Sequence, residues 1–513
     1  MQLIKYLNHL FFKDNSKKYT RTTDYIFWLM VIIFAFIYSF MSLNNHRLFE
    51  TYGWDLAVFD HGIWQWSKFK LPYSSFHDLY WLADHFHLIL VIITPFYWIF
   101  NDVRVLLVVQ AVVTCLGAVP IYLLSKRIVK HDLFSLTLSL GYLTFYSLQW
   151  HTFSGFHELA FLPLTLGCVM YFWTVNNKKQ YFIWFILALF VKEEIGFLLA
   201  AFGLWSLFSD RKRLRQSLVS IFLGLIVSLI LIYVVMPGFG TGEYRHFGYG
   251  KLGNTPVEVI INLIKNPQLL IYSFIDSPQK ISTMFVTFWP WLFLPVFAPA
   301  TLILVFEQFA TRFWDYGKVI RWTPFFAYSL PMATIMAWGS IYGFKNLINK
   351  FKFRHIGKRY LACTFVSFIL LGVIIFEDII LHAPINSLFK QSFYRTEQWM
   401  IDNKNAIDCV PDNVSVSAQN NLAPYLSQRH KIKVFPEGLN KGYEYIVVDL
   451  HKGQSENSFH FLGSGNTQFI IDDLVSRGLY QKLCEYGDSL VLQKVKETEG
   501  LINYPFDIEI DEK

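Results

Sequence analysis

The stretch YIFWLMVIIFAFIYSFMSL, residues 25–43, is apolar over its whole length and contains no Asp, Glu, Lys or Arg. Its length falls within the roughly 17–25 residues that a helix needs to cross a bilayer. Further stretches of the same character are 105–125, 133–150, 159–175, 216–236, 322–344 and 360–376. Only 16% of the residues are charged and 54% are hydrophobic, whereas about 25% are charged in soluble domains. These features predict an α-helical polytopic membrane protein.

Basic residues are concentrated in alternate loops between the apolar stretches. The clusters lie at 13–21, 126–130, 178–179, 211–215 and 345–359. Because Lys and Arg are enriched in cytoplasmic loops, we expect a multi-pass plasma-membrane protein with a cytoplasmic N-terminus and a retained first helix. The net charge of +7 then reflects membrane topology, and we expect no nucleic-acid partner.

Three apolar stretches are too short or too interrupted to be simple spans. Residues 88–100 are predicted to form a helix lying at, or dipping into, the outer membrane face. Residues 181–209 are interrupted by charged residues at 192–194, which predicts two half-spans meeting at a polar break. Residues 281–306 contain three prolines and predict a broken hairpin, a form tolerated where protein satisfies the backbone. The expected number of spans is about ten.

The composition changes after residue 376, and the chain becomes polar from residue 385 onward. The segments DNVSVSAQ (412–419), YEYIVVDL (443–450) and SLVLQKV (489–495) predict strands. The segment FIIDDLVSRGLYQKL (469–483) has apolar residues at helical spacing. A small mixed α/β domain is therefore expected, in which Cys409 and Cys484 are able to pair if it is extracytoplasmic.

The predicted organisation has three parts. A cytoplasmic segment covers 1–23, and a transmembrane core covers 24–382 with external loops at 44–104 and 237–280. The extracytoplasmic α/β domain covers 383–513.

The stretch TYGWDLAVFDHGIWQWSKFK, residues 51–70, follows the first span and contains Asp55 and Asp60. Apolar residues recur there at three- and four-residue spacing, which predicts an amphipathic helix over 56–68 on the membrane surface. Asp55 either caps this helix or performs chemistry at the start of the first external loop. Asp60 lies about 140° around the helix from Asp55, so the two carboxylates are not expected to share a face.

Further titratable residues cluster at three places. Asp84, His85 and His87 begin the short apolar stretch, and a carboxylate beside two imidazoles suits acid–base chemistry or a divalent cation. His157 and Glu158 lie between two spans, where a glutamate also stabilises a helix start without any function. The charged triplet 192–194 interrupts a span, where charges are costly and indicate function unless they pair with each other.

The long loop 237–280 begins with PGFGTGEYRHFGYGKLG. Its glycines and aromatic residues predict a flexible cover, in which Arg245, His246 and Lys251 are candidates to bind a phosphate. The alternative is a solvated glycine-rich loop without a ligand.

The motif WDLAVFDHGIW, which contains Asp55, Asp60 and Trp64, resembles the opening signature of an uncharacterised membrane family, the domain of unknown function 2079. The motifs DHFHLIL, GFHELA and VKEEIG, and the later SAQNNLAPYLSQRHKIKVFPE, occur in the order found in that family. The chain departs from the family pattern at Glu158, which is displaced by one position, and at Ala327, where a histidine is common.

That family in turn resembles the GT-C superfamily of polytopic glycosyltransferases, which use polyprenyl-phosphate sugars and have an essential acid in the first external loop. The resemblance implies a GT-C-like core in which Asp55 is the leading catalytic candidate. Asp60, Asp84, His85 and Glu193 are the other catalytic candidates, and Asp55, Asp84 and His85 are the candidate ligands of a divalent cation. The candidate substrate-binding residues are His157, Glu158, Lys192, Arg245 and Lys251.

The expected function is transfer of a sugar from a polyprenyl-phosphate-linked donor to an extracytoplasmic glycan, lipid or protein acceptor. The alternative is a transporter or flippase of a lipid-linked or small polar substrate. Transporters usually bind near the bilayer midplane, whereas most acids here gather on the outer side. The charged triplet 192–194 is the exception that supports this alternative.

Overall fold

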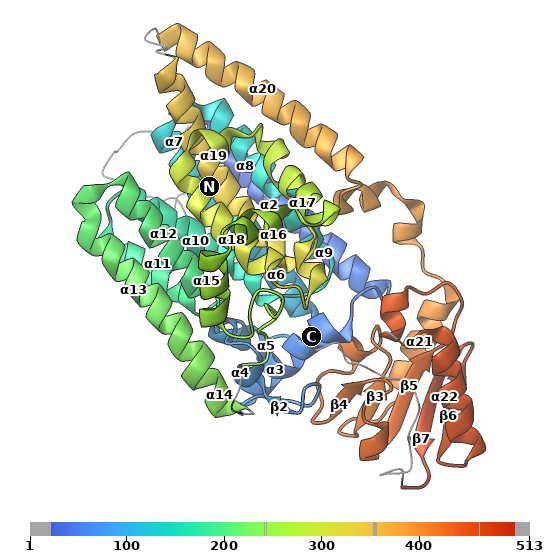
Figure 1. Cartoon of the computed structure of the whole chain (residues 1–513). Coiled ribbons are helices and arrows are strands. Elements are labelled where there is room, and N and C mark those ends of the chain that lie inside the picture. Colours follow the sequence, from blue (N-terminus) through green and yellow to red (C-terminus); the bar gives the residue numbers. More distant parts are fainter. Residues whose placement is uncertain (1–21, 241, 243, 352–355, 461, 498–513) are drawn as a thin grey trace.

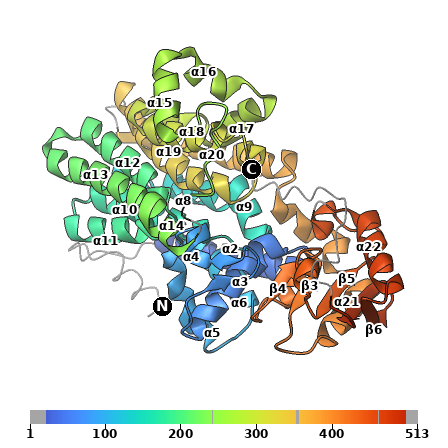
Figure 2. The same cartoon turned by 60° about the horizontal axis from the view of Figure 1, so that its bottom comes forward.

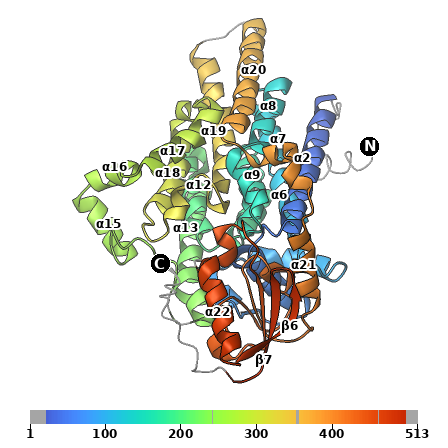
Figure 3. The same ribbon diagram turned by 90° about the vertical axis from the view of Figure 1, so that its right-hand side faces the viewer.

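The computed structural model describes residues 22–240, 242, 244–351, 356–460 and 462–497. It has a helical bundle with a smaller domain at one end, formed by the C-terminal part of the chain (Figure 1). The long helices of the bundle run roughly alongside one another, and the smaller domain lies beyond their ends (Figure 3). We call this end of the bundle the domain end.

The bundle is built from helices of very different lengths. Its main helices are α2 (Thr22–Arg47), α6 (Arg104–Leu116), α7 (Ala118–Ile128), α8 (Asp132–Leu143), α9 (Tyr146–Phe153), α10 (Leu162–Thr174), α11 (Lys178–Leu189), α12 (Ile195–Ser209), α13 (Leu214–Ile230), α17 (Pro278–Phe288), α18 (Leu302–Phe313), α19 (Leu330–Lys350) and α20 (Ile356–Ile380). Among the described residues, four helical stretches are long and apolar enough to cross a membrane: Thr22–Arg47, Arg104–Ile128, Arg211–Phe239 and Ile356–Ile380.

Helix α2 shows why these helices belong in a membrane. Phe27 and Tyr38 are buried against the rest of the bundle, while Leu29 and Phe36 on the other face are exposed. Large apolar side chains that point outward on a long helix are stable only in a hydrocarbon environment. The outer face of α2 is therefore a lipid-facing surface.

Both interrupted stretches are broken where the sequence indicates. The chain leaves the helical state between α11 and α12, at residues 190–194. Between α17 and α18, short 3-10 turns at Trp289–Trp291, Leu294–Phe297 and Pro299–Thr301 replace a continuous helix. Proline removes a backbone donor and clashes with the preceding turn of a helix, which accounts for this break.

Two predicted external segments differ from expectation. Residues 88–100 form a 3-10 helix, Leu88–Ile93, followed by the short helix α5 (Thr94–Tyr97), in place of one continuous helix. The segment 237–280 is not simply a flexible cover, because it contains α15 (Pro256–Lys265) and α16 (Gln268–Ile275). Thr255 caps α15 by accepting a hydrogen bond from the backbone N–H of Glu258, and these two helices project away from the bundle (Figure 3).

The C-terminal domain contains a five-stranded sheet with the order β4-β3-β5-β7-β6. The strands are β3 (Val416–Ala418), β4 (Ile432–Val434), β5 (Tyr445–Asp449), β6 (Tyr480–Tyr486) and β7 (Ser489–Lys494). Strands β4, β3 and β5 are parallel, whereas β7 and β6 are antiparallel to their neighbours. Helices α21 (Gln398–Asp408) and α22 (Ser464–Ser476) pack beside this sheet (Figure 2).

The three predicted strand segments contain β3, β5 and β7. The predicted helix over 469–483 is wrong in its second half. Helix α22 ends at Ser476, and the chain continues as strand β6. Gly478 has φ +63°, a left-handed conformation that favours glycine and ends helices. Its backbone N–H donates to the carbonyl of Val475, so the helix stops where the pattern of apolar residues alone does not show it.

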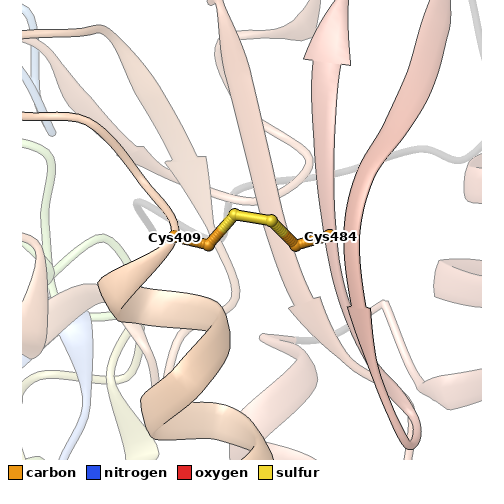
Figure 4. Close-up of a disulfide and its surroundings, with 2 residues drawn as sticks. All are labelled: Cys409 and Cys484. Carbon is orange, nitrogen blue, oxygen red and sulfur yellow. A yellow bond between two sulfur atoms is a disulfide. The ribbon is translucent and has the colours of Figure 1, made fainter.

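A disulfide joins Cys409, directly after α21, to Cys484 on β6 (Figure 4). The sequence left the pairing of these two cysteines open, and the structure shows that they pair. The other three cysteines, Cys115, Cys168 and Cys363, are free and buried.

Candidate functional site

Residues 51–67 are mostly buried between the bundle and the C-terminal domain, and only the last three residues of the stretch 51–70 are exposed. The stretch forms a short π-helix, Gly53–Ala57, that continues into α3 (Val58–Ser67). Asp60, His61 and Ile63 are all buried, so α3 has no polar face toward solvent of the kind that an amphipathic surface helix needs. The predicted interfacial helix over 56–68 is thus corrected to a helix enclosed by protein.

Asp55 is not a helix cap. It lies in the first turn of the π-helix, and the residue before that helix, Tyr52, makes no side-chain capping hydrogen bond. The Asp55 carboxylate is partly buried and accepts no hydrogen bond from the residues that the structure describes. Burial raises the pKa of Asp55 to about 6, because a charged carboxylate loses solvation there.

The C-terminal domain holds the stretch around Asp55 in place. The backbone N–H of Gly53 is 2.8 Å from the carbonyl oxygen and 2.9 Å from the side-chain oxygen of Asn420. A Cβ atom on Gly53 would lie 2.9 Å from Cγ2 of Val434, which is closer than carbon atoms pack. A glycine is needed at this position because the two backbones approach each other directly.

Asp60 makes a second connection to the C-terminal domain. Its carboxylate accepts hydrogen bonds from Ser427 at 2.5 Å and Gln428 at 3.2 Å, and from Tyr97 of the bundle at 2.6 Å. Asp60 lines a cavity of about 1140 Å³ that Asp55 does not line. The expectation that the two carboxylates occupy different faces is therefore confirmed.

A separate cavity of about 1090 Å³ lies at the domain end and is lined by Asp55. Its wall includes residues from the loop after α2, from the segment 237–280 and from the C-terminal domain. One wall is continuous: the Trp54 indole nitrogen lies 3.1 Å from Nε2 of His460, and the rings of Trp54 and His77 are 5.3 Å apart. His77 is in turn 3.9 Å from the Asp84 carboxylate.

The far end of this wall is positively charged. Nε2 of His246 lies 3.0 Å from Oδ1 of Asp84, and Nζ of Lys318 lies 3.2 Å from Nδ1 of His246. Arg245, which precedes His246 in the chain, also lines the cavity. We call Arg245 and Lys318 the cationic end of the cavity.

Asp84, His85 and His246 form a group able to hold a metal ion. Their candidate ligand atoms all lie within 4.8 Å of one another, and the rings of His85 and His246 are stacked with centroids 4.1 Å apart. One carboxylate with two imidazoles suits zinc and related transition metals. The structure brings together two of the predicted ligands, Asp84 and His85, while Asp55 is not in the group and His246 takes its place.

The surroundings of this group fit a metal site. Nδ1 of His85 lies 2.8 Å from Oε1 of Glu193, which leaves the other ring nitrogen for a metal, as in carboxylate–histidine–metal arrangements. Burial lowers the pKa of His85 to about 4, so the ring is neutral at pH 7, as a ligand must be. Burial opposes ionisation of Asp84, but His77, His85 and His246 hold the pKa of Asp84 well below its usual range.

The predicted substrate-binding residues His157, Glu158 and Lys192 lie behind the cavity, and the structure places none of them in its lining. Lys192 is 3.4 Å from Glu158 and 4.0 Å from Glu194, and Glu158 is 3.0 Å from His157. Glu194 also pairs with Arg321, which in turn pairs with Asp315. Buried charges that compensate one another in this way lower the cost of removing each from water.

The predicted phosphate-binding cations Arg245 and Lys251 lie in different places. Arg245 reaches the cavity, whereas Lys251 is exposed outside it with its ammonium 4.3 Å from the ring centre of Tyr316. Of the candidate phosphate ligands, Arg245 and His246 are in the cavity lining that the structure describes.

The profile of the family "Predicted membrane protein (DUF2079)" matches residues 45–464, which cover the cavity and most of the C-terminal domain. The chain belongs to the DUF2079 family. No curated protein has a significant sequence match to it. The family resemblance inferred from the motifs is therefore confirmed.

One of two similar solved structures is close enough to indicate the fold. The crystal structure of ArnT from Cupriavidus metallidurans bound to undecaprenyl phosphate matches with a TM-score of 0.51 and 11% identity, over 94% of this chain and 100% of that one. The structure of the same protein in the apo state gives a TM-score of 0.49 and 11% identity, over 92% and 98% of the chains. This DUF2079 protein is therefore a membrane protein with an ArnT-like helical fold and a small C-terminal sheet domain.

Several cavity residues have no signal in the sequence. Trp54, His77 and Lys318 line the cavity, as do Asn420 and residues of the loop 455–463. A single tryptophan or histidine near a span has too many ordinary roles to stand out, and the C-terminal loop is 400 residues from Asp55 in the chain. His246 is among the predicted phosphate ligands, but nothing in the sequence indicates that it joins Asp84 and His85.

Proposed function

We propose that this protein is a GT-C-type glycosyltransferase that moves a sugar from a polyprenyl-phosphate donor to an acceptor outside the membrane. The observation that carries the proposal is the cavity at the domain end. It combines the carboxylate of Asp55 with the cationic end and with the Asp84–His85–His246 group. The GT-C-like fold supports this reading, and the ArnT structure with undecaprenyl phosphate bound supports a lipid-linked donor.

In this reaction the acceptor hydroxyl oxygen attacks the anomeric carbon of the donor sugar. The bond between that carbon and the phosphate oxygen breaks, and the polyprenyl phosphate leaves as an anion. Asp55 takes the proton of the acceptor hydroxyl, because its carboxylate accepts no hydrogen bond from described residues and is ionised above pH 6. Arg245 and Lys318 stabilise the negative charge that develops on the phosphate.

A divalent cation held by Asp84, His85 and His246 would add charge stabilisation at the same end of the cavity. Glu193 orients the ring of His85 for this role. Metal analysis of the purified protein and of a His246→Ala variant tests this part of the proposal separately from transfer.

The cavity is assigned to the extracytoplasmic side on two grounds. The basic loops of the chain favour a cytoplasmic location for the opposite end of the bundle. The disulfide between Cys409 and Cys484 favours an oxidising compartment for the C-terminal domain. The N-terminus is then cytoplasmic and the C-terminal domain extracytoplasmic.

Replacement of Asp55 by Asn tests the function. Lipid-linked sugars are extracted from cells that lack the gene and from cells that express the wild type or D55N. We expect one polyprenyl-phosphate sugar to accumulate in the deletion and D55N cells alike, since loss of a general base lowers the rate about 10²–10⁴-fold. Accumulation identifies the donor, and normal lipid profiles in D55N cells at equal expression would contradict the role of Asp55.

Asp60→Asn is the matched control, because Asp60 is a nearby carboxylate that lines the other cavity. We assign Asp60 to holding the C-terminal domain in place. D60N should retain transfer at permissive temperature but lower the free energy of unfolding by about 1–3 kcal/mol, since it weakens a buried hydrogen-bonding group.

The alternative, a transporter of a lipid-linked or polar substrate, is supported by the buried charges around Lys192. Purified protein reconstituted in vesicles distinguishes the two. Movement of the accumulated lipid across the vesicle membrane that persists in D55N would favour transport over transfer.

A further inference from the structure

The two ends of the Asp55 cavity differ sharply in charge. All the lysine and arginine side chains in the described lining, Arg245 and Lys318, are at the cationic end. The opposite end is formed by Glu50 and Tyr52, which follow α2, and by the C-terminal residues Ser455, Glu456, Asn457 and His460. We call these six residues the domain subsite.

The domain subsite carries negative charge. Glu50 and Glu456 are both exposed to the cavity, and Asp55 lies next to Trp54, whose ring connects the two ends. Burial lowers the pKa of His460 to about 4, so this ring adds no positive charge at pH 7. An anionic ligand placed here would be repelled by carboxylates at short range.

The same subsite is rich in groups that bind hydroxyls. The Tyr52 hydroxyl donates to Oε2 of Glu50 at 2.8 Å, which leaves the second carboxylate oxygen, Oε1, without a hydrogen bond from described residues. Ser455 and Asn457 add a hydroxyl and an amide. The ring of Trp54 provides an apolar face beside them, a combination of apolar surface and convergent polar groups that is typical of sites for small polar ligands.

The order of groups along the cavity indicates which substrate belongs here. In a displacement at the anomeric carbon, the leaving phosphate and the attacking hydroxyl lie on opposite sides of that carbon. A phosphate at the cationic end therefore places the acceptor beyond Asp55, toward the domain subsite.

We propose that the domain subsite binds the acceptor, and that this acceptor is a hydroxyl-rich sugar without negative charge. This inference rests on the proposed transfer reaction and assigns the choice of acceptor to the C-terminal domain. Asn420 is a positioning residue for the subsite, because its side chain accepts from Gly53 and donates to the carbonyl of Asn457. It thereby connects the backbone before Asp55 to the loop that carries Glu456 and His460.

Binding of free sugars to the full-length protein in lipid nanodiscs, without donor, tests the proposal. The probes are the methyl glycosides of glucose, galactose, mannose and N-acetylglucosamine, with methyl glucuronide and a serine-containing peptide as comparisons. Saturation-transfer NMR should show binding of at least one uncharged glycoside but not of the glucuronide or the peptide. No binding of any uncharged glycoside, or equal binding of the glucuronide, would overturn the proposal.

Two substitutions locate the binding. Glu50→Gln should weaken the affinity for the glycoside about tenfold, which is the effect of losing one charge-assisted hydrogen bond. Glu485→Gln, an exposed glutamate on β6 paired with Lys482, is the matched control and should bind like the wild type. Glu456→Lys reverses a charge at the subsite and should allow the glucuronide to bind, a gain that misfolding cannot produce.

The outcomes separate this proposal from the transfer reaction. Unchanged glycoside binding in E50Q together with no glucuronide binding in E456K would contradict the proposed subsite but not the transfer reaction. Sugar binding without accumulation of a lipid-linked donor in the deletion cells would instead support the subsite and contradict the transfer reaction.

Discussion

The carboxylate of Asp55 has an environment that separates its chemical role from a structural one. It is neither a helix cap nor part of an ion pair among the described residues, and burial raises its pKa to about 6. A carboxylate that the fold leaves without partners is costly to keep. Such a cost is typical of residues retained for function.

The raised pKa of Asp55 predicts an acid limb in the rate of transfer. The base is active only when ionised, so its active fraction falls about tenfold per pH unit well below pH 6. Initial rates of sugar transfer by membranes, measured from pH 5 to pH 8, should rise with an apparent pKa near 6 and then level off. A flat profile over this range would contradict a titrating base at this position.

Stability should change in the opposite direction to activity. Because the pKa of Asp55 is higher in the folded state than in the unfolded chain, the folded protein binds more protons between about pH 4 and 6. The contribution of Asp55 to stability is therefore largest at low pH and declines as pH rises through its folded pKa. Thermal unfolding of D55N beside the wild type measures this difference and distinguishes loss of the base from acid unfolding.

Among the elements, the π-helix Gly53–Ala57 connects the bundle to the C-terminal domain. Its first residue hydrogen-bonds to Asn420, and α3, which follows, is held to the same domain through Asp60 and His61. The segment that carries Asp55 is thus attached to the same domain that forms most of the domain subsite.

Gly53→Ala tests this connection. The new Cβ would meet Val434, Asn420 and Ala423 at 2.9–3.1 Å, so the π-helix must shift away from the C-terminal domain. We expect a loss of about 1–3 kcal/mol in the free energy of unfolding and a clear reduction in transfer, because Asp55 moves with it. Gly465→Ala is the control, since nothing lies within 4 Å of that position, and equal effects of the two changes would contradict the proposed contact.

At the scale of the whole molecule, the disulfide between Cys409 and Cys484 stabilises the C-terminal domain. Replacement of both Cys409 and Cys484 by Ser should lower the free energy of unfolding by about 3–5 kcal/mol, because the disulfide joins residues 75 positions apart in the chain. Cys363→Ala, a free buried cysteine in α20, is the control for general loss of packing.

Labelling of intact cells tests the orientation. After treatment with a membrane-impermeant reductant, an impermeant maleimide should label Cys409 and Cys484 of the wild type. Labelling that requires permeabilised cells would place the C-terminal domain in the cytoplasm and contradict the proposed topology.

The sequence by itself determined the fold class, because charge-free apolar stretches such as 25–43 have few stable environments other than a bilayer. It also indicated the interrupted spans, through the prolines between 281 and 306 and the charges at 192–194. The motif around Asp55 identified the family, which the match over 45–464 confirms. The number of spans remains a prediction.

Only the tertiary structure decided what lies around Asp55. Helical spacing in 56–68 indicates apolar faces but not what covers them, so it did not distinguish a membrane surface from the C-terminal domain. Likewise, His246 joins Asp84 and His85, and Lys192 pairs with Glu158, across large separations in the chain. The physical reason is that a site depends on distances between side chains in space, whereas local patterns in a sequence report mainly on the element to which each residue belongs.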